Sequence, residues 1–232
     1  MFAWARLWEW VETNPTIELK KLKESPNERK PWPNDMLVQQ AIELAEPWAA
    51  RVFFFLARTG ARPIAAKRLT WKDVDFENRT IVIMSYKGRE GKLRRSKFPM
   101  SYDIFEFLNY LKRERSQVPI IGEFAQLVFH SKTGRTLDTK DLANEMQRIT
   151  KKMNLVGYTT YGFRHKFATD LANPSKDGSR SGNLESARKA LGHSSISQTQ
   201  RYNHQEDVVF MSEVEKLAES TLIKFNKIKG GN

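Results

Sequence analysis

The sequence predicts an α+β domain that is mainly α-helical and carries one small antiparallel β-sheet. Several stretches place apolar residues at helical spacing, whereas only one pair of neighbouring segments looks like the two strands of a hairpin. Internal repeats and low-complexity tracts are absent from the sequence. A chain of 232 residues is long enough for one main domain with attached pieces and a sizeable core.

The chain opens with an apolar stripe that is followed by a linker-like segment. Trp4, Leu7 and Trp8 are spaced as on one face of a helix, and charged residues between them argue against a signal peptide. Residues 14–33 hold four prolines and many charges, which is the composition of a linker. We therefore predict that residues 1–35 are the last helix of an upstream domain together with an interdomain linker.

Helices and strands are predicted in order along the rest of the chain. Pro47 suits the first turn of a helix and Gly60 its end. Residues 80–85 and 92–98 flank the polar loop YKGREG, as the two strands of a hairpin would. Apolar periodicity predicts further helices, and LVFH a short strand, at these positions: helices 35–46, 47–58, 101–115, 138–153, 161–172, 183–191 and 206–226, and the strand 127–130.

Composition narrows the class of partner and of chemistry. Lysine and arginine number 39 against 27 acidic residues, which gives a net charge of +12 and favours a polyanionic partner. Cysteine is absent from the sequence, so disulfides, thiolate metal sites and cysteine nucleophiles are excluded, and a cytoplasmic location is expected. No apolar run approaches the roughly 20 residues that a membrane span needs.

Four stretches combine unusual polar residues with apolar helix frames. Together they supply arginines, a lysine, histidines and tyrosines, but no cluster of carboxylates that could hold the cations of a metal-dependent nuclease. Phosphoryl transfer without a metal needs fixed cations on the phosphate oxygens, and guanidinium groups suit that task. The stretches are RTGAR (58–62), YKGREGK (86–92), YGFRHKFATD (161–170) and LGHSSISQTQRYNH (191–204).

The order of these stretches resembles the tyrosine recombinase family over about residues 37–205. The segment that begins TGARPIAAKRLTW is similar to the family's first-arginine box, YKG to its mobile lysine loop, YGFRHKFATD to its second-arginine box, and LGHSSISQTQRYNH to its terminal box. The resemblance implies the recombinase catalytic-domain fold for residues 36–205. The catalytic residues that it implies are Arg62, Lys87, Tyr161, Arg164, His193 and Tyr202.

The resemblance also implies a role for each residue. Tyr202 attacks a DNA phosphate to form a 3′-phosphotyrosyl link, which conserves the bond energy so that neither ATP nor another cofactor is needed. Arg62 and Arg164 hold the non-bridging oxygens. Lys87 protonates the leaving 5′-oxygen, and His193 donates a hydrogen bond to the phosphate. His165 is expected to support the site from its helix.

The sequence departs from the family pattern at several positions. Tyr161 stands where the second-arginine box usually has histidine, and a tyrosine hydroxyl, with a reference pKa near 10, is a poor base at neutral pH. Ala65 replaces the acidic residue usual three places after the first arginine. Lys92 is an alternative to Lys87 as the catalytic lysine. The segment NPSKDGSRSGN, which starts at residue 173, is longer than is usual in the family.

The resemblance also implies a partner and an assembly: double-stranded DNA, bound by a homo-tetramer on paired recombination sites that assembles from a chain monomeric in isolation. Accessory DNA-bending or directionality proteins are further candidate partners, and a membrane is not. Basic stretches 87–97 and 145–152 are candidate phosphate contacts. Residues 206–232 form a predicted helical tail that packs on its own chain or docks onto a neighbouring protomer.

Taken together, these features predict an integrase that inserts and excises a mobile element in a prokaryotic or phage setting, where it associates with the nucleoid. Three alternatives stay open: a type IB topoisomerase, a catalytically silent DNA-binding protein, and an unrelated basic helical adaptor.

Overall fold

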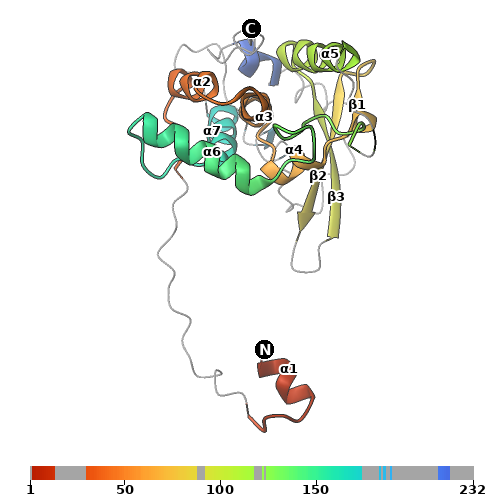
Figure 1. Cartoon of the computed structure of the whole chain (residues 1–232), viewed down its shortest axis with the longest axis vertical. Coiled ribbons are helices and arrows are strands. Elements are labelled where there is room, and N and C mark those ends of the chain that lie inside the picture. Colours follow the sequence, from red (N-terminus) through yellow and green to blue (C-terminus); the bar gives the residue numbers. More distant parts are fainter. Residues whose placement is uncertain are drawn as a thin grey trace.

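The computed structural model describes residues 2–13, 30–87, 92–117, 122, 124–173, 183, 185–186, 189 and 214–219. Helices α2, α3, α6 and α7 gather beside a small antiparallel sheet, and α5 crosses one end of that sheet (Figure 1). The predicted class is thereby confirmed. In chain order the elements are α1 (Phe2–Leu7), α2 (Asp35–Glu43), α3 (Pro47–Thr59), α4 (Pro63–Arg68), the 3-10 helix η1 (Trp71–Asp73), β1 (Val74–Asp75), β2 (Thr80–Lys87), β3 (Lys92–Pro99), α5 (Tyr102–Gln117), α6 (Thr139–Lys152) and α7 (Thr160–Ala172).

Helix α3 is the central element of the core. It starts with Pro47 at its first turn and ends before Gly60, whose φ of 63° is left-handed, so both predicted ends are confirmed. Phe53 packs on Phe163 of α7 with ring centroids 5.7 Å apart, and Phe54 packs on Phe107 of α5 at 4.8 Å. Helix α3 therefore fixes the positions of α5 and α7 relative to each other.

Helix α2 is shorter than the sequence predicts. It ends at Glu43 rather than at residue 46, and Glu46 becomes the N-cap of α3. A residue that precedes proline is disfavoured in the helical conformation, so the helix stops before Pro47. The backbone N–H of Glu46 donates instead to the Glu145 carboxylate of α6 at 2.8 Å. This contact joins α6 to the turn between α2 and α3.

The sheet has three strands in the order β1-β2-β3. The predicted hairpin is confirmed, and its strands pair in register from Thr80↔Pro99 to Lys87↔Lys92. Its far end projects from the body (Figure 1). The predicted strand at 127–130 is wrong: only Leu127 makes an isolated bridge, to Thr70, because the following residues turn into the core, where Phe129 is buried.

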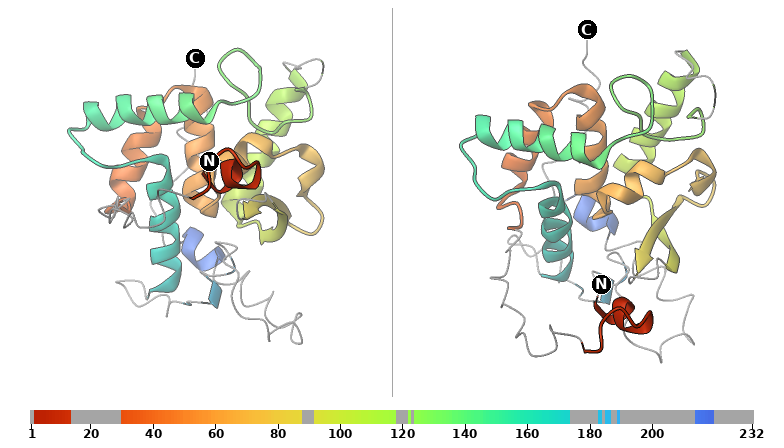
Figure 2. Two further views of the ribbon diagram at one scale, coloured as in Figure 1. Left: turned by 90° about the horizontal axis from the view of Figure 1, so that it is seen from below. Right: turned by 60° about the horizontal axis from the view of Figure 1, so that its bottom comes forward.

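Helical residues 214–219 pack on the body of the same chain. Val214 and Leu217 are buried against Phe98, Phe167 and Leu171, and Figure 2 shows this short helix beside α7. Since Phe98 lies on β3 and Phe167 on α7, this part of the predicted tail joins the sheet to α7. Docking of other tail residues onto a neighbouring protomer stays a prediction.

Candidate active site

The turn between α3 and α4 positions the first candidate arginine. The Thr59 hydroxyl donates to the Phe55 carbonyl at 2.7 Å and accepts from the backbone N–H of Ala61 at 3.2 Å. These bonds and the left-handed Gly60 end α3, and α4 begins three residues later at Pro63. Arg62 then becomes the N-cap residue of α4, half-buried at the start of that helix.

The second candidate arginine reaches the same turn from α7. The Arg164 side chain is buried, and its Nη1 donates to the Gly60 carbonyl oxygen at 2.7 Å. A Cβ on Gly60 would lie 2.6 Å from Cδ1 of Phe167, so α7 can approach this closely only because residue 60 is glycine. Gly60 therefore serves the site twice, through its conformation and through its carbonyl oxygen.

Arg62 and Tyr161 both lie close enough to Arg164 to influence its charge. Burial and, to a smaller extent, the positive charge of Arg62 lower the pKa of Arg164, whereas Tyr161 opposes the shift, and the net pKa is about 10. A guanidinium with this pKa keeps its charge at neutral pH. Two like charges held close together in a partly buried place favour an anion between them, and guanidinium groups match the oxygens of a phosphate.

The other predicted site residues are not all described. Lys87 ends β2 and is the Cα partner of Lys92, the first residue of β3, so the backbone places both lysines at the far end of the hairpin. His193 and Tyr202 lie outside the described residues. The structure thus brings together Arg62, Tyr161 and Arg164, and the inclusion of the other residues stays a prediction.

Two departures from the family pattern have a structural setting. Tyr161 lies in the first turn of α7, half-buried and near Arg164. Ala65 is 5% exposed and belongs to the apolar core, where an unpaired carboxylate would be costly. The Gly60 carbonyl, rather than an acidic side chain at position 65, accepts a hydrogen bond from Arg164. His165 is exposed on α7.

Two buried residues that connect α7 to the segment before α2 were not predicted from the sequence. Lys166 is buried on α7, and its Nζ lies 2.6 Å from a carboxylate oxygen of Asp35 and 2.5 Å from one of Asp170. Trp32, in the predicted linker, is 2% exposed and packs on α7. A tryptophan between two prolines in a charged segment is a signal for such an anchor, whereas the Lys166 contacts give no local signal.

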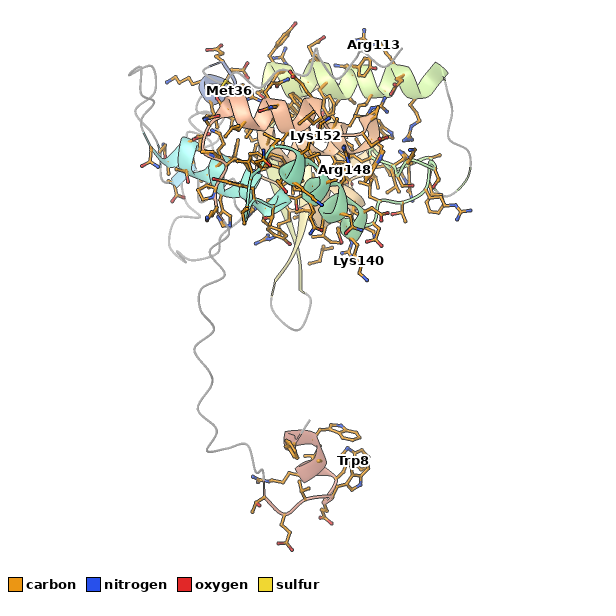
Figure 3. The ribbon with its side chains drawn as sticks, turned by 60° about the vertical axis from the view of Figure 1, so that its left-hand side comes forward. Trp8, Met36, Arg113, Lys140, Arg148 and Lys152 are labelled. Carbon is orange, nitrogen blue, oxygen red and sulfur yellow. The ribbon has the colours of Figure 1, made fainter. Side chains whose placement is uncertain are left out.

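The basic stretch 145–152 divides into a structural part and an exposed part. Nη2 of Arg148 donates to the Glu145 carboxylate and to the Leu44 carbonyl, both at 2.7 Å, so this cation is engaged within the protein. Lys151 and Lys152 are exposed at the end of α6. Figure 3 shows Lys140, Arg148 and Lys152 spread along that helix. The exposed lysines remain the candidate phosphate contacts of this stretch.

No group of three or more His, Cys, Asp or Glu side chains in the described ranges could hold a metal ion. Within the same part of the chain, no helix combines the length and the apolar character needed to cross a membrane.

Comparison with solved structures defines the class of fold. The integrase of transposon Tn1549 in complex with a circular intermediate DNA matches with a TM-score of 0.61 at 21% identity, over 92% of this chain and 75% of that one. The integrase from mycobacterium phage Brujita matches with a TM-score of 0.60 at 16% identity, over 98% of this chain and 71% of that one. The fold is that of a tyrosine recombinase catalytic domain.

Comparison of sequences gives the family. The model described as the phage integrase family matches residues 36–208, and the chain belongs to that family. A tyrosine recombinase XerC from Oceanobacillus iheyensis is 27% identical over 84% of this chain and 63% of its own length. A tyrosine recombinase XerC from Pediococcus pentosaceus is 30% identical over 63% of this chain and 46% of its own length. The chain thus spans about half to two thirds of the length of these curated relatives.

Proposed function

We propose that the protein is a site-specific DNA recombinase that cleaves and rejoins duplex DNA through a 3′-phosphotyrosyl intermediate. The observation that carries the proposal is the hydrogen bond from Arg164 to the Gly60 carbonyl, two residues before Arg62, which brings both cations to the same turn. Membership of the phage integrase family supports the same reaction class. Two adjacent guanidinium groups match the non-bridging oxygens of one phosphodiester.

The proposed reaction starts at Tyr202. Its phenolic oxygen forms a bond to the scissile phosphorus while the bond from phosphorus to the 5′-oxygen breaks, and the proton that the 5′-oxygen needs comes from Lys87 or Lys92. Arg62 and Arg164 hold the charge on the non-bridging oxygens, where each donor is worth about 3 to 4 kcal/mol in comparable oxyanion sites. Attack by a 5′-hydroxyl on the phosphotyrosine reverses the step and joins the strands.

Tyr161 takes a supporting part in the proposed reaction. Its place near Arg164 in the first turn of α7 suits a hydroxyl that donates a hydrogen bond to the phosphate. A phenol does not serve as a base at neutral pH. Tyr202 therefore gives its phenolic proton to solvent water or to a basic side chain, not to Tyr161, and His193 is proposed to donate a hydrogen bond to the phosphate.

The proposed biological role is integration and excision of a mobile element. Similarity to the transposon integrase and the phage integrase supports this role, although the curated relatives carry the name tyrosine recombinase XerC. The proposed assembly is a homo-tetramer on two paired sites, formed from monomers and directed by accessory DNA-bending or directionality proteins.

A nicked suicide substrate tests the reaction. Duplexes that bind are first selected from a randomised pool, then nicked beside the bound site so that a cleaved strand is lost and the covalent adduct accumulates. We expect an adduct with the wild-type chain and with Tyr102→Phe, a control at an exposed tyrosine on α5, and none with Tyr202→Phe. An adduct that persists in Tyr202→Phe contradicts the proposal.

Two alternatives give different results in the same experiment. A type IB topoisomerase would relax supercoiled plasmid without site preference, whereas the proposed recombinase joins paired sites. A catalytically silent DNA-binding protein would select a duplex and form no adduct with any variant.

A further inference from the structure

The end of the predicted linker packs on α7, the helix that carries Arg164. Trp32 is 2% exposed and stacks on Phe163, with ring centroids 5.3 Å apart and planes inclined by only 9°. Its ring also contacts Tyr158 at 5.3 Å, and its Nε1 donates to the Thr159 carbonyl at 3.4 Å. Trp32 thus holds the residues on both sides of Tyr161.

Gly162 permits this close contact. A Cβ at position 162 would lie 2.8 Å from the Lys30 carbonyl oxygen and 3.0 Å from Cδ1 of Trp32. Backbone from the linker therefore rests directly on the backbone of α7, between Tyr161 and Phe163. Glycine has a low helix propensity and therefore destabilises the first turn of α7. The contact between the linker and Gly162 offsets this loss of helix stability.

A second attachment lies one turn further along α7. The Lys166 Nζ is 2.6 Å from the carboxylate of Asp35, the first residue of α2, and 2.5 Å from that of Asp170. Lys166 is 9% exposed, so water screens these charges less than at the surface. Residues 30–35, which we call the strap, therefore contact α7 on both sides of Arg164, at Gly162 and at Lys166.

We propose that the strap positions Tyr161 and Arg164 and that Trp32 couples the segment upstream of the strap to the candidate active site. This inference rests on the proposed function for the reaction that it regulates. Residues 30–35 are the end of the predicted interdomain linker, so a displacement of the linker acts on α7 through Trp32 and Asp35. A displacement of the chain upstream of residue 30 would then reach the phosphate site without any contact to the phosphate.

Three variants separate positioning from folding. Trp32→Phe keeps an aromatic ring for Phe163 but loses the hydrogen bond to Thr159, and Trp32→Leu loses both. Gly162→Ala adds a methyl group that pushes the strap away while it raises the helix propensity of α7. The matched control is Trp48→Leu, since Trp48 also packs on the main core but lies at the opposite end of α3 from Gly60, about 16 to 18 Å away along the helix.

The first measurement does not depend on catalysis. Amide hydrogen exchange of the full chain is followed for α7 and, as reference, for α5. We expect Trp32→Leu and Gly162→Ala to raise exchange at residues 161–166 by about tenfold or more with α5 unchanged, an effect that Trp48→Leu lacks. Equal acceleration in α5 and α7, or none in α7, overturns the proposal whether or not the protein cleaves DNA.

The second measurement is the cleavage rate on the selected nicked duplex at saturating DNA. A displacement of about 1 Å can cost ~100-fold in rate, so we expect Trp32→Leu and Gly162→Ala to cleave about tenfold or more slowly while the Kd for DNA stays within about twofold. Trp32→Phe should fall between wild type and Trp32→Leu. Normal cleavage by Trp32→Leu and Gly162→Ala refutes the positioning role of the strap and leaves the proposed function intact. Absence of cleavage by the wild type refutes the proposed function, and the hydrogen-exchange result then decides whether the strap positions α7.

Discussion

Replacement of Gly60 by alanine tests how the turn builds the site. Residue 60 has a φ of 63°, which costs an L-residue about 1 to 2 kcal/mol. The new Cβ would also lie 2.6 Å from Cδ1 of the buried Phe167, and overpacking of this kind costs about 1 to 3 kcal/mol. We therefore expect Gly60→Ala to lower the free energy of unfolding by about 2 to 5 kcal/mol.

The chain offers a matched control for the backbone part of this cost. Gly122 has a φ of 89°, and a Cβ there would meet no atom within 4 Å, so Gly122→Ala carries strain without a clash. Its expected loss is about 1 to 2 kcal/mol. Urea unfolding gives both values, and the difference between the two variants measures the contact with Phe167.

A double-mutant cycle completes the test. Phe167→Leu makes room for the new methyl group, so the Gly60→Ala/Phe167→Leu double variant should be about 1 to 2 kcal/mol more stable than the sum of the single effects predicts. Strict additivity, or a Gly60→Ala loss no larger than that of Gly122→Ala, would refute the reasoning that α7 approaches the turn closely at Gly60.

Three further predictions concern charged groups. Asp103→Ala should lower the free energy of unfolding in urea by about 3 to 5 kcal/mol, because the buried Arg58, 4% exposed, loses its carboxylate partner. The double variant Arg58→Met/Asp103→Leu should have a stability closer to that of the wild type. Equal losses of stability in both variants would contradict this. Arg148 lowers the pKa of the Glu145 carboxylate below its ordinary 4.5, so the stability that this ion pair adds is complete above pH 4.5 and is lost as the pH falls through the lowered pKa. The melting temperature of Glu145→Gln should therefore fall less between neutral and acid pH than that of the wild type. An equal fall in both proteins would contradict this. Arg164→Lys should slow single-turnover cleavage about 100- to 1000-fold because lysine lacks the forked donors, and an unchanged rate would exclude Arg164 from the site.

Local patterns predicted the long elements well. Pro47 and Gly60 marked both ends of α3, and alternation marked the hairpin, because each signal depends on residues close in sequence. The short helix α4 and the two-residue strand β1 were missed, since elements this short show no periodicity. The apolar run at 127–130 was assigned to a strand although its burial comes from core packing rather than pairing.

The residues of the candidate site also fall into those that local patterns predicted and those that depend on contacts distant in sequence. The box patterns nominated Arg62 and Arg164, and the structure brings Arg164 to the Gly60 turn that Arg62 follows. The Gly60 carbonyl and the carboxylate of Asp35 were not nominated, because their partners Arg164 and Lys166 are more than a hundred residues away in the chain. Contacts of this kind depend on the packing of α3, α2 and α7, which no local pattern encodes.

The central claim is that Tyr202 forms the covalent bond to DNA, and mapping of the adduct tests this claim most directly. Trypsin cuts after Arg201 and Lys216, so Tyr202 is the only tyrosine in its peptide. After nuclease digestion, mass spectrometry should find the nucleotide remnant on residues 202–216, with the phosphate at the 3′ end of the DNA. A remnant on residues 153–164, which contain Tyr158 and Tyr161, would contradict the account.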